Sequence, residues 1–494
     1  MRRLIIGLLV LVLLVGAALA AFVYWMLAGD GTRLALERQG SAWLGQPVHI
    51  ESARPQILPR IGVQLHNVTV GSPARVSLAD VEVSTGLRAL LSRRIEDAAV
   101  TISDSRIDMP LPFEVPGSAG RGTPTSASGT VQLVSITAIR LRNVVISSRG
   151  REIALSADSS LVGSRLTLRS ATASSRATTI TATGLVQVEP ALDAQLQANA
   201  NKLDVDDLLA LADAFSPGGG RATSSRSPGR IVAKIAADSV SAAGLTLPQF
   251  TTTARVQGDR VSLSPTRFLL FGGRYEGDLD LNLRDSTSVK LASRIKDVDV
   301  AQLAAFGGVP DTITGKLSGS GTFEGRGDDF TAVLASARGS GTATILNGTI
   351  RRLNLVRTVV LFFGRPAPGT EAATDAFDRM DARFTLARQV LTAEALSLQS
   401  RDADIVAQGT LSLASKALDG HADVSLSEEL SKQAGTDLYR YTQEGNRIVL
   451  PASIGGTLSS PRLTIDAGAA VKRGLKNEVE RRMKGLLDRF KPAN

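Results

Sequence analysis

The chain of 494 residues contains no cysteine, which excludes disulfide bonds, zinc–thiolate sites, iron–sulfur clusters and thiol nucleophiles. Its three histidines, His49, His66 and His421, show no metal-ligand spacing and are interpreted as isolated residues. The sequence also lacks the G-x-S-x-G, P-loop and H-E-x-x-H motifs. One S-x-x-K occurs at residues 293–296, as chance allows in a Ser-rich chain. We therefore expect no enzymatic activity, no metal and no cofactor.

Aromatic residues are also scarce, at 4% of the chain, whereas hydrophobic residues make up 43%. This combination fits long, regular β-structure better than a compact enzyme with a large aromatic core. The formal net charge is +9, and much of the basic excess lies in residues 472–491. Because the remainder is close to balanced, the sequence does not have the diffuse basic surface of a nucleic-acid binder, and we expect no nucleic-acid partner.

Charged residues are absent from residues 4–28, a run long enough for a transmembrane helix. Arg2 and Arg3 precede the run and Asp30 follows it, so the positive-inside rule predicts a cytoplasmic N-terminus and an exported body. The alternative is a cleaved signal peptide, for which residues 18–20 offer small side chains. The long apolar run favours an anchor, and we expect a single-pass membrane protein with an exported body.

Short runs of alternating apolar and polar residues recur from residue 60 onward. Leu279, Leu281 and Leu283, for example, alternate with Asp280 and Asn282. A period of two gives each strand one apolar and one polar face, as is common in antiparallel sheets. Helices are predicted only near residues 31–44, 205–214, 300–306 and 355–363 and at the C-terminus.

Two stretches rich in Gly, Ser and Pro, residues 116–129 and 216–229, are interpreted as loops or as domain joints. The chain also repeats itself. The repeated unit consists of a strand, a turn, a second strand and an Asp-Val step that leads into a short apolar segment. It begins at Gly184 and again at Gly277, and a looser copy begins at Gly409. Repeated two-strand units indicate an array that stacks strand on strand.

The C-terminal segment has apolar residues at mostly three- and four-residue spacing and a basic opposite face. This pattern predicts an amphipathic helix, which either lies on an anionic membrane surface or covers the end of the sheet. The predicted organisation is an anchor at 1–29, an N-terminal region at 30–115, a β-rich middle at 116–229, a C-terminal β region at 230–465 and the basic helix at 466–494.

A long array of one-sided strands needs a cover for its apolar face. The sheet either closes around a filled core or stays open as a groove for an apolar ligand. The residues that we expect to line this face are Val81, Val83, Ile102, Leu133, Leu279, Leu281, Leu283, Leu291 and Ile295.

Several segments, taken in order, resemble the AsmA family of Gram-negative envelope proteins. They are WLGQPVHI at 43–50, PRIGVQLHNVTV at 59–70, FGGRYEGDLDLNL at 271–283 with Asp299, Val300 and Leu303 after it, GSGTATILNGTI at 339–350 and IGGTLSSPRL at 454–463. No single segment is diagnostic, but their order is fairly specific. Residues 113–230 resemble the family only in their general strand character.

The resemblance implies a mainly β fold, an elongated antiparallel sheet curled into an open groove, of the bridge-like lipid-transfer type. It further implies phospholipid as the ligand, transfer between inner and outer membranes, and support of outer-membrane integrity. Outer-membrane or other envelope proteins are candidate partners. The alternatives are a scaffold or assembly factor for outer-membrane protein biogenesis without a lipid path and, less favoured, an exported hydrolase.

Overall fold

The computed structural model describes residues 30–56, 61–85, 94–95, 97–111, 132–133, 136–215, 229–283, 286–328, 330–350, 376–433, 443–444 and 447–466, with residues 468, 469, 472, 479 and 483. The predicted anchor and the predicted helix near 355–363 lie outside these residues. Of the predicted C-terminal helix, only single helical residues such as Val479 and Met483 are described, so the helix as a whole stays a prediction. In the described part of the chain, no helix has the length and apolar character needed to cross a membrane.

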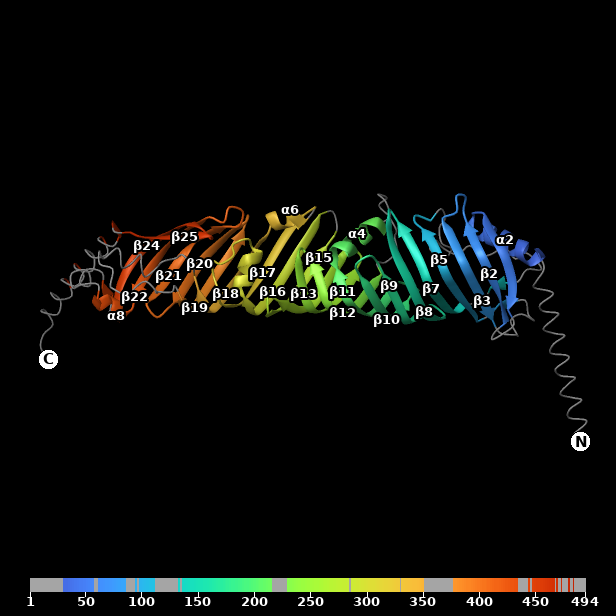
Figure 1. The fold of residues 1–494 in the computed structure, drawn as a ribbon, viewed down its shortest axis with the longest axis horizontal. Coiled ribbons are helices and arrows are strands. Elements are labelled where there is room, and N and C mark those ends of the chain that lie inside the picture. The colour runs from blue at the N-terminus through green and yellow to red at the C-terminus, as the bar shows by residue number, and fades with distance from the viewer. Residues whose placement is uncertain are drawn as a thin grey trace, which may run out of the picture. The chain divides into compact units, whose positions relative to one another are not determined.

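The chain forms two compact units, which are described separately. Residues 1–250 and 254–258 make up the first unit, and residues 251–253 and 259–494 make up the second. Strands dominate both units (Figure 1). The helices of the first unit are α2 (Asp30–Leu44) and α4 (Val205–Phe215). Those of the second are α5 (Val300–Phe306), α6 (Phe330–Ala335) and α8 (Glu428–Gln433).

The strands of the first unit are β1 (Val48–Gln56), β2 (Ile61–Val70), β3 (Val76–Thr85), β4 (Arg94–Ile95), β5 (Ala98–Asp108), β6 (Gln132–Leu133), β7 (Ile136–Ser148), β8 (Arg151–Val162), β9 (Arg165–Ser174), β10 (Thr179–Gln187), β11 (Asp193–Asp204) and β12 (Arg230–Ala242), together with most of β13 (Leu245–Gln257). Neighbours pair in the order β1–β2–β3–β5–β7–β8–β9–β10–β11–β12. The short β4 and β6 pair with each other.

The strands of the second unit are β14 (Arg260–Leu270), β15 (Gly273–Asn282), β16 (Thr287–Asp299), β17 (Lys316–Gly327), β18 (Arg338–Thr349), β19 (Ala376–Ala387), β20 (Val390–Gln399), β21 (Ala403–Ser412), β22 (Leu418–Leu426), β23 (Gln443–Glu444), β24 (Arg447–Thr457) and β25 (Ser460–Ile465). They pair antiparallel in chain order from β14 to β22, and then β22 pairs with β24 and β24 with β25. No strand described in this unit pairs β14 back to β25, so its sheet is open.

The predicted antiparallel arrangement holds for most of the sheet, but the first unit contains two parallel steps. β5 pairs parallel with β7, and β11 pairs parallel with β12. Parallel neighbours need a connection that returns the chain to the starting edge, whereas antiparallel neighbours need only a turn. The two stretches at 116–129 and 216–229 fall in these two connections, almost wholly outside the described residues. The strands that flank each stretch are direct neighbours in one sheet.

The internal repeat is confirmed as a structural unit. Gly184, Gly277 and Gly409 lie in β10, β15 and β21, and each of these strands pairs with the next one along the chain. A short helix follows the second strand each time, namely α4, α5 and α8. The Asp of the repeated Asp-Val step starts the first two helices. Asp204 accepts a hydrogen bond from the backbone N–H of Asp207 at 3.0 Å, and Asp299 accepts one from Gln302 at 3.1 Å.

Charged residues on the polar face help to fix the register of the second unit. Asp280 pairs with Lys290, Lys290 with Glu324, and Glu324 with Arg338, so charge alternates across four strands. The Arg338 guanidinium lies 2.6 Å from the Glu324 carboxylate. Opposite charges on directly paired residues favour this register, and a shift of one residue would bring the apolar face to the polar side.

Candidate functional site

The strands of the second unit carry an apolar face that continues from one strand to the next. Directly paired residues point to the same side of a sheet, so the pairing registers define this face. One row of paired residues runs from β14 to β22 through Leu263, Leu279, Leu291, Phe323, Gly339, Leu386, Leu391, Leu411 and Leu418. Except for Gly339, every member of the row is a leucine or a phenylalanine.

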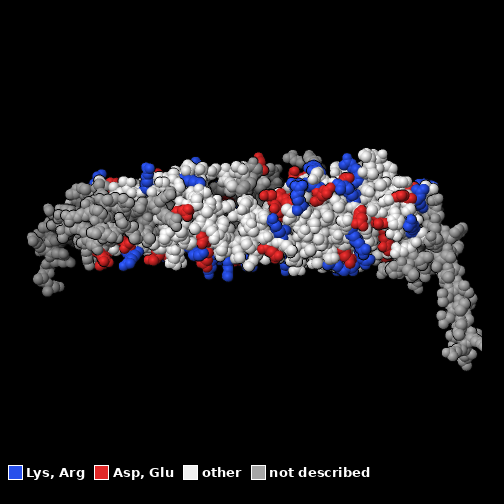
Figure 2. Space-filling view, in the orientation of Figure 1, with Lys and Arg blue, Asp and Glu red and all other residues white. Residues whose placement is uncertain are grey.

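Four of the predicted lining residues come together on this face. Leu279 and Leu291 are direct partners in the row, Leu281 pairs with Val289, and Ile295 pairs with Tyr275. All four predicted residues are partly buried, whereas Asp280, Lys290 and Arg294, which point to the other side, are exposed. Around β16 to β19, the charged side chains on the surface in view lie mainly along its margins (Figure 2).

We call the part of this face on β14 to β18 the open face, because the large apolar side chains of its row are only partly buried. Val298, near the end of β16, is the exception at 0% exposed. Its aromatic rings lie over glycines. Phe268 and Tyr275 stack with ring centroids 4.2 Å apart and planes inclined by 9°. A side chain at Gly277 would meet the Tyr275 hydroxyl, and one at Gly341 would meet the Phe384 ring. Burial raises the pKa of the Tyr275 phenol, and the negative charge of Asp278 raises it further.

The same side of the sheet is filled near β20 to β25, and we call that cluster the filled core. Val424, Ile448 and Leu450 are 0% exposed there. The other buried members are Phe377, Leu398, Ala403, Ile405, Ala407, Ala422, Leu426, Ala452 and Leu463. Polar contacts surround it. Arg447 donates to Asp404 at 2.5 Å and to the Leu426 carbonyl at 2.6 Å.

The three predicted lining residues in the N-terminal strands also share one face. Val81 pairs with Ile102, and Val83 pairs with Val100. Here the face is covered, because Leu36 of α2 packs on the cluster that contains Val81. Val81 is 8% exposed. These residues therefore lie in a small core at the start of the sheet.

Farther along the first unit, α4 covers a second small core with Val205 and Leu208. The helix is held at both ends. Asp207, which is 8% exposed, accepts hydrogen bonds from Arg151 and Ser175. Ser148 donates to the carbonyl oxygen of Ala214, at the opposite end of α4.

The last two predicted lining residues do not join the face. Leu283 follows the end of β15 and is 53% exposed. Its alternation with Leu279 and Leu281 is interrupted because the strand ends at Asn282, after which the backbone N–H of Leu283 binds the Asp259 carbonyl. Leu133 lies in the two-residue strand β6, paired with Ile95 of β4 and outside the main sheet. The prediction that it lines the common face is therefore not supported by its position.

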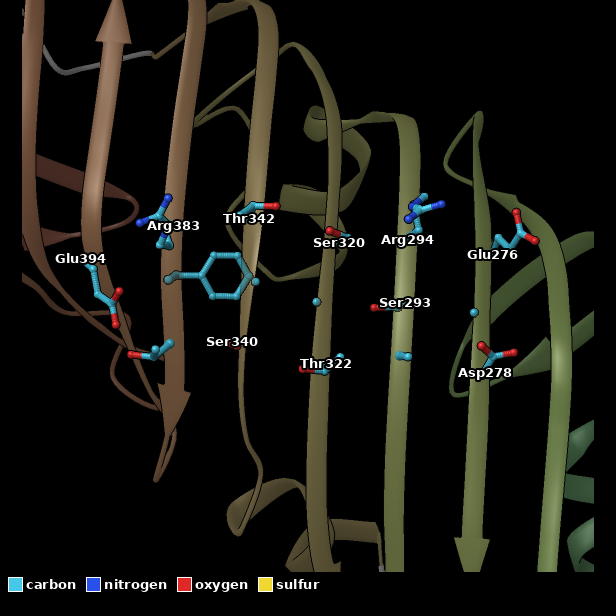
Figure 3. A pocket seen from close by; sticks show the side chains of 16 residues that line it. Glu276, Asp278, Ser293, Arg294, Ser320, Thr322, Ser340, Thr342, Arg383 and Glu394 are labelled. Carbon is cyan, nitrogen blue, oxygen red and sulfur yellow. The ribbon is translucent and has the colours of Figure 1, made fainter.

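The polar face holds a hollow of about 740 Å³ that the sequence did not indicate. Ser320, Thr322, Ser340 and Thr342 occupy its middle on β17 and β18 (Figure 3). Charged residues lie at its two ends: Arg383 and Glu394 at one, and Glu276, Asp278 and Arg294 at the other. The signal was the alternation of hydroxyl residues with glycines in 318–322 and 339–342, which leaves only short side chains on this face.

Most side chains of the hollow are exposed, and the Asp278 carboxylate at one end accepts a hydrogen bond from the Ser264 hydroxyl. Across the described residues, no three His, Asp or Glu side chains converge in a way that would hold a metal ion. The sheet of the second unit therefore offers a long apolar surface on one face and a polar surface on the other.

The fold and this surface define a class: proteins built on a long, mostly antiparallel sheet with one continuous apolar face. The AsmA family model matches residues 169–395, which run from β9 to β20, so this part of the chain is similar to the AsmA family. The match includes the open face. It also includes residues 169–230, where the expected resemblance was weakest. No curated protein and no solved structure matches the chain.

Proposed function

We propose that the protein binds or conducts phospholipid along the apolar face of its sheet, without enzymatic activity, and so supports outer-membrane integrity. The observation that carries this proposal is the row of paired apolar residues from Leu263 to Leu418, whose large side chains are only partly buried. In this proposal the sheet curls into a groove, acyl chains lie along the open face and headgroups stay in water at its margin. The AsmA-family match over the same strands agrees with such a role.

The energetics favour a continuous face over a deep pocket. Each CH₂ group of an acyl chain in water costs about 0.8 kcal/mol relative to an apolar environment. A lipid that moves from a bilayer to the open face exchanges one apolar environment for another, so little net driving force is needed. Any polar interruption of the row would raise the barrier, because acyl chains would have to cross it in contact with water or charge.

The proposed location follows from residues 1–29, which would anchor the chain in the inner membrane with the body in the periplasm. Lipid would then reach the open face from that membrane. The second candidate function is a scaffold for outer-membrane protein biogenesis. The filled core favours it, because Val424 and Leu450 leave no room for a ligand on that part of the face.

The test places a carboxylate on the open face. Leu281→Asp with Leu291→Asp should lower the amount of phospholipid that co-purifies with the full-length protein, measured by mass spectrometry, by at least about ten-fold, because acyl chains packed on the two carboxylates would remove their hydration. Ala292→Asp is the matched control, since Ala292 is next to Leu291 but is exposed on the opposite side.

Crosslinking in cells separates the two candidate functions. A photoreactive residue at position 291 should capture lipid, and one at position 292 should not. Absence of lipid both from the purified protein and from the crosslinks would refute lipid binding and leave the scaffold. Lipid crosslinks that persist in the double Asp variant would show that the lining residues are assigned wrongly.

A further inference from the structure

One contact in the second unit joins two parts of the sheet that are far apart along the chain. The Lys416 ammonium group donates a hydrogen bond to the carbonyl oxygen of Gly308 at 3.2 Å. Lys416 lies in the turn between β21 and β22, and Gly308 lies in the loop between α5 and β17. Strand pairing connects these two places only through the consecutive strands β17 to β21.

The contact joins opposite edges of the sheet. Successive antiparallel strands alternate in direction, so β17, β19 and β21 all start at the edge that carries α5. The turn after β21 therefore lies at the other edge. For Lys416 to reach Gly308, the sheet between them has to curl until its edges approach each other.

The apolar face is on the enclosed side of this curl. On β19, Ala382 and Phe384 are partly buried and the intervening Arg383 is exposed. On β20, Leu396 is partly buried, whereas Glu394 is exposed. These exposures place the apolar side chains on the inner side of the curl, while the hollow on the polar face lies over its short Ser and Thr side chains. The Lys416–Gly308 contact thus spans the gap through which this stretch of the apolar face would otherwise meet water.

Both ends of the contact are held firmly by backbone hydrogen bonds. The carbonyl oxygen of Lys416 accepts a bond from Leu458 N–H at 2.9 Å, and the N–H of Gly308 donates to Ala305 at 3.0 Å. The lysine side chain is the adjustable part. Its acceptor in this contact is a neutral carbonyl, and an ammonium group binds an anionic oxygen more strongly. An anionic group that enters the gap can therefore displace the carbonyl.

We propose that the gap between the α5–β17 loop and the β21–β22 turn is a lateral opening for amphiphiles with an anionic headgroup. Lys416 closes this opening onto Gly308 and binds the headgroup when it opens. This inference rests on the proposed lipid function, and it adds the place where the ligand passes and the residue that meets its charge.

The first test measures opening without any lipid. Because the chain has no cysteine, Ala382→Cys places a single thiol on the enclosed side, and Thr342→Cys places one on the exposed side as the matched control. Lys416→Met keeps the aliphatic stem and removes the donor, and it should speed reaction of the enclosed thiol with a bulky water-soluble maleimide by about five-fold. Lys416→Arg should retain the slow rate, and the exposed thiol should react equally in all forms. An unchanged rate at the enclosed thiol in Lys416→Met would overturn the inference.

The second test concerns the ligand. Full-length protein is mixed with vesicles that carry fluorescent phosphatidylglycerol or diacylglycerol of the same acyl chains. Wild type should take up the anionic lipid faster, and Lys416→Met should lose this preference. Inorganic phosphate alone should not speed reaction of the enclosed thiol, because it gains nothing from the apolar side. A phosphate effect equal to that of phosphatidylglycerol would overturn the assignment to amphiphiles.

A crosslink provides the complementary measurement. Gly307 accepts a side chain without close contacts, since its nearest neighbours would be 3.5 Å from a Cβ atom, so Gly307→Cys with Lys416→Cys can be bridged by a bis-maleimide. The bridge should block lipid uptake. As a control, a bridge between Ala414→Cys and Ser459→Cys, which both lie at the edge with the β21–β22 turn, should not block uptake. Uptake that continues through the bridged gap would exclude it as the opening. If wild type binds neither lipid, the proposed function fails, and the thiol assay still decides whether Lys416 closes the gap.

Discussion

The open face and the filled core lie on the same side of one sheet, yet their apolar residues are buried to different extents. Leu279 and Leu291 on the open face are partly buried, whereas Val424 and Leu450 in the filled core are 0% exposed. The strands of both regions alternate with a period of two. The difference is therefore not in the pattern but in what packs against it. One region has the properties of a protein interior, and the other keeps its large apolar side chains partly exposed.

The largest expected difference between the two regions concerns large-to-small substitutions. Leu450→Ala should lower the free energy of unfolding by about 2–5 kcal/mol, because it leaves a cavity in a fully packed core. Leu291→Ala should cost about 1 kcal/mol, because the side chain gains only part of its transfer free energy when it is partly buried. Urea unfolding followed by hydrogen-exchange mass spectrometry reports on each region separately. Equal losses of unfolding free energy at the two sites would mean that the open face is packed as tightly as the filled core.

A smaller effect is expected where rings lie over glycines. Gly341→Ala would bring a Cβ atom to 2.7 Å from the Ser320 carbonyl oxygen and 2.8 Å from the Phe384 ring. Strand and ring must both move, so we expect destabilisation of about 1–3 kcal/mol. Gly455→Ala in β24 is the control, because nothing lies within 4 Å of its Cβ position, and it should change stability by less than about 0.5 kcal/mol. A neutral Gly341→Ala would show that the rings on the open face are loosely held.

The smallest effect concerns the cap at the end of β16. A hydrogen bond from the Gln302 backbone N–H holds the pKa of the Asp299 carboxyl below its usual range, and Lys316 contributes as well. A lowered carboxyl pKa stabilises the fold above the ordinary carboxyl pKa, and this contribution is lost as pH falls through the lowered value. Asp299→Ala should thus destabilise α5 by about 1 kcal/mol at neutral pH and make little difference below about pH 3.

Hydrogen exchange measures this loss of stability at the amides of α5, and the amides of the filled core serve as an internal reference. The reference amides should not change. A loss that is the same at pH 7 and at pH 3 would contradict the assignment of Asp299 as an ionised cap. Equal loosening of the filled core would show that the two regions unfold together.

Much of the fold could be predicted because the signals are local. Alternation predicted the strands, and short helices were predicted near residues 205–214 and 300–306, where α4 and α5 lie. The capping roles of Asp204 and Asp299 came from the structure. The pattern also selected Leu279, Leu281, Leu291 and Ile295, which the structure brings onto one face. Such success is expected where each residue's environment depends mainly on the strand that contains it.

The rest depends on long-range arrangement. Leu283 continues the alternation in the sequence, but its strand has already ended. The parallel steps cannot be predicted from strand patterns, since a strand has the same alternation in either direction. Whether Leu291 or Val424 would be the more buried also could not be predicted, because that depends on what packs above the sheet. The contact of Lys416 with Gly308 needs five strands to curl together.

The two parallel steps have a consequence for the order of assembly. Within a hairpin, pairing begins close to the turn, as at Ser148 and Arg151. Across a parallel step no partners are close in sequence: Ala98 pairs with Ile136, and Asp193 with Arg230. Loop closure delays such pairs. We expect the run β7 to β11 to form early in folding and the β5–β7 pair to form later. Pulsed hydrogen exchange during refolding would reveal this order, with the parallel steps as the joints between separately formed hairpin runs.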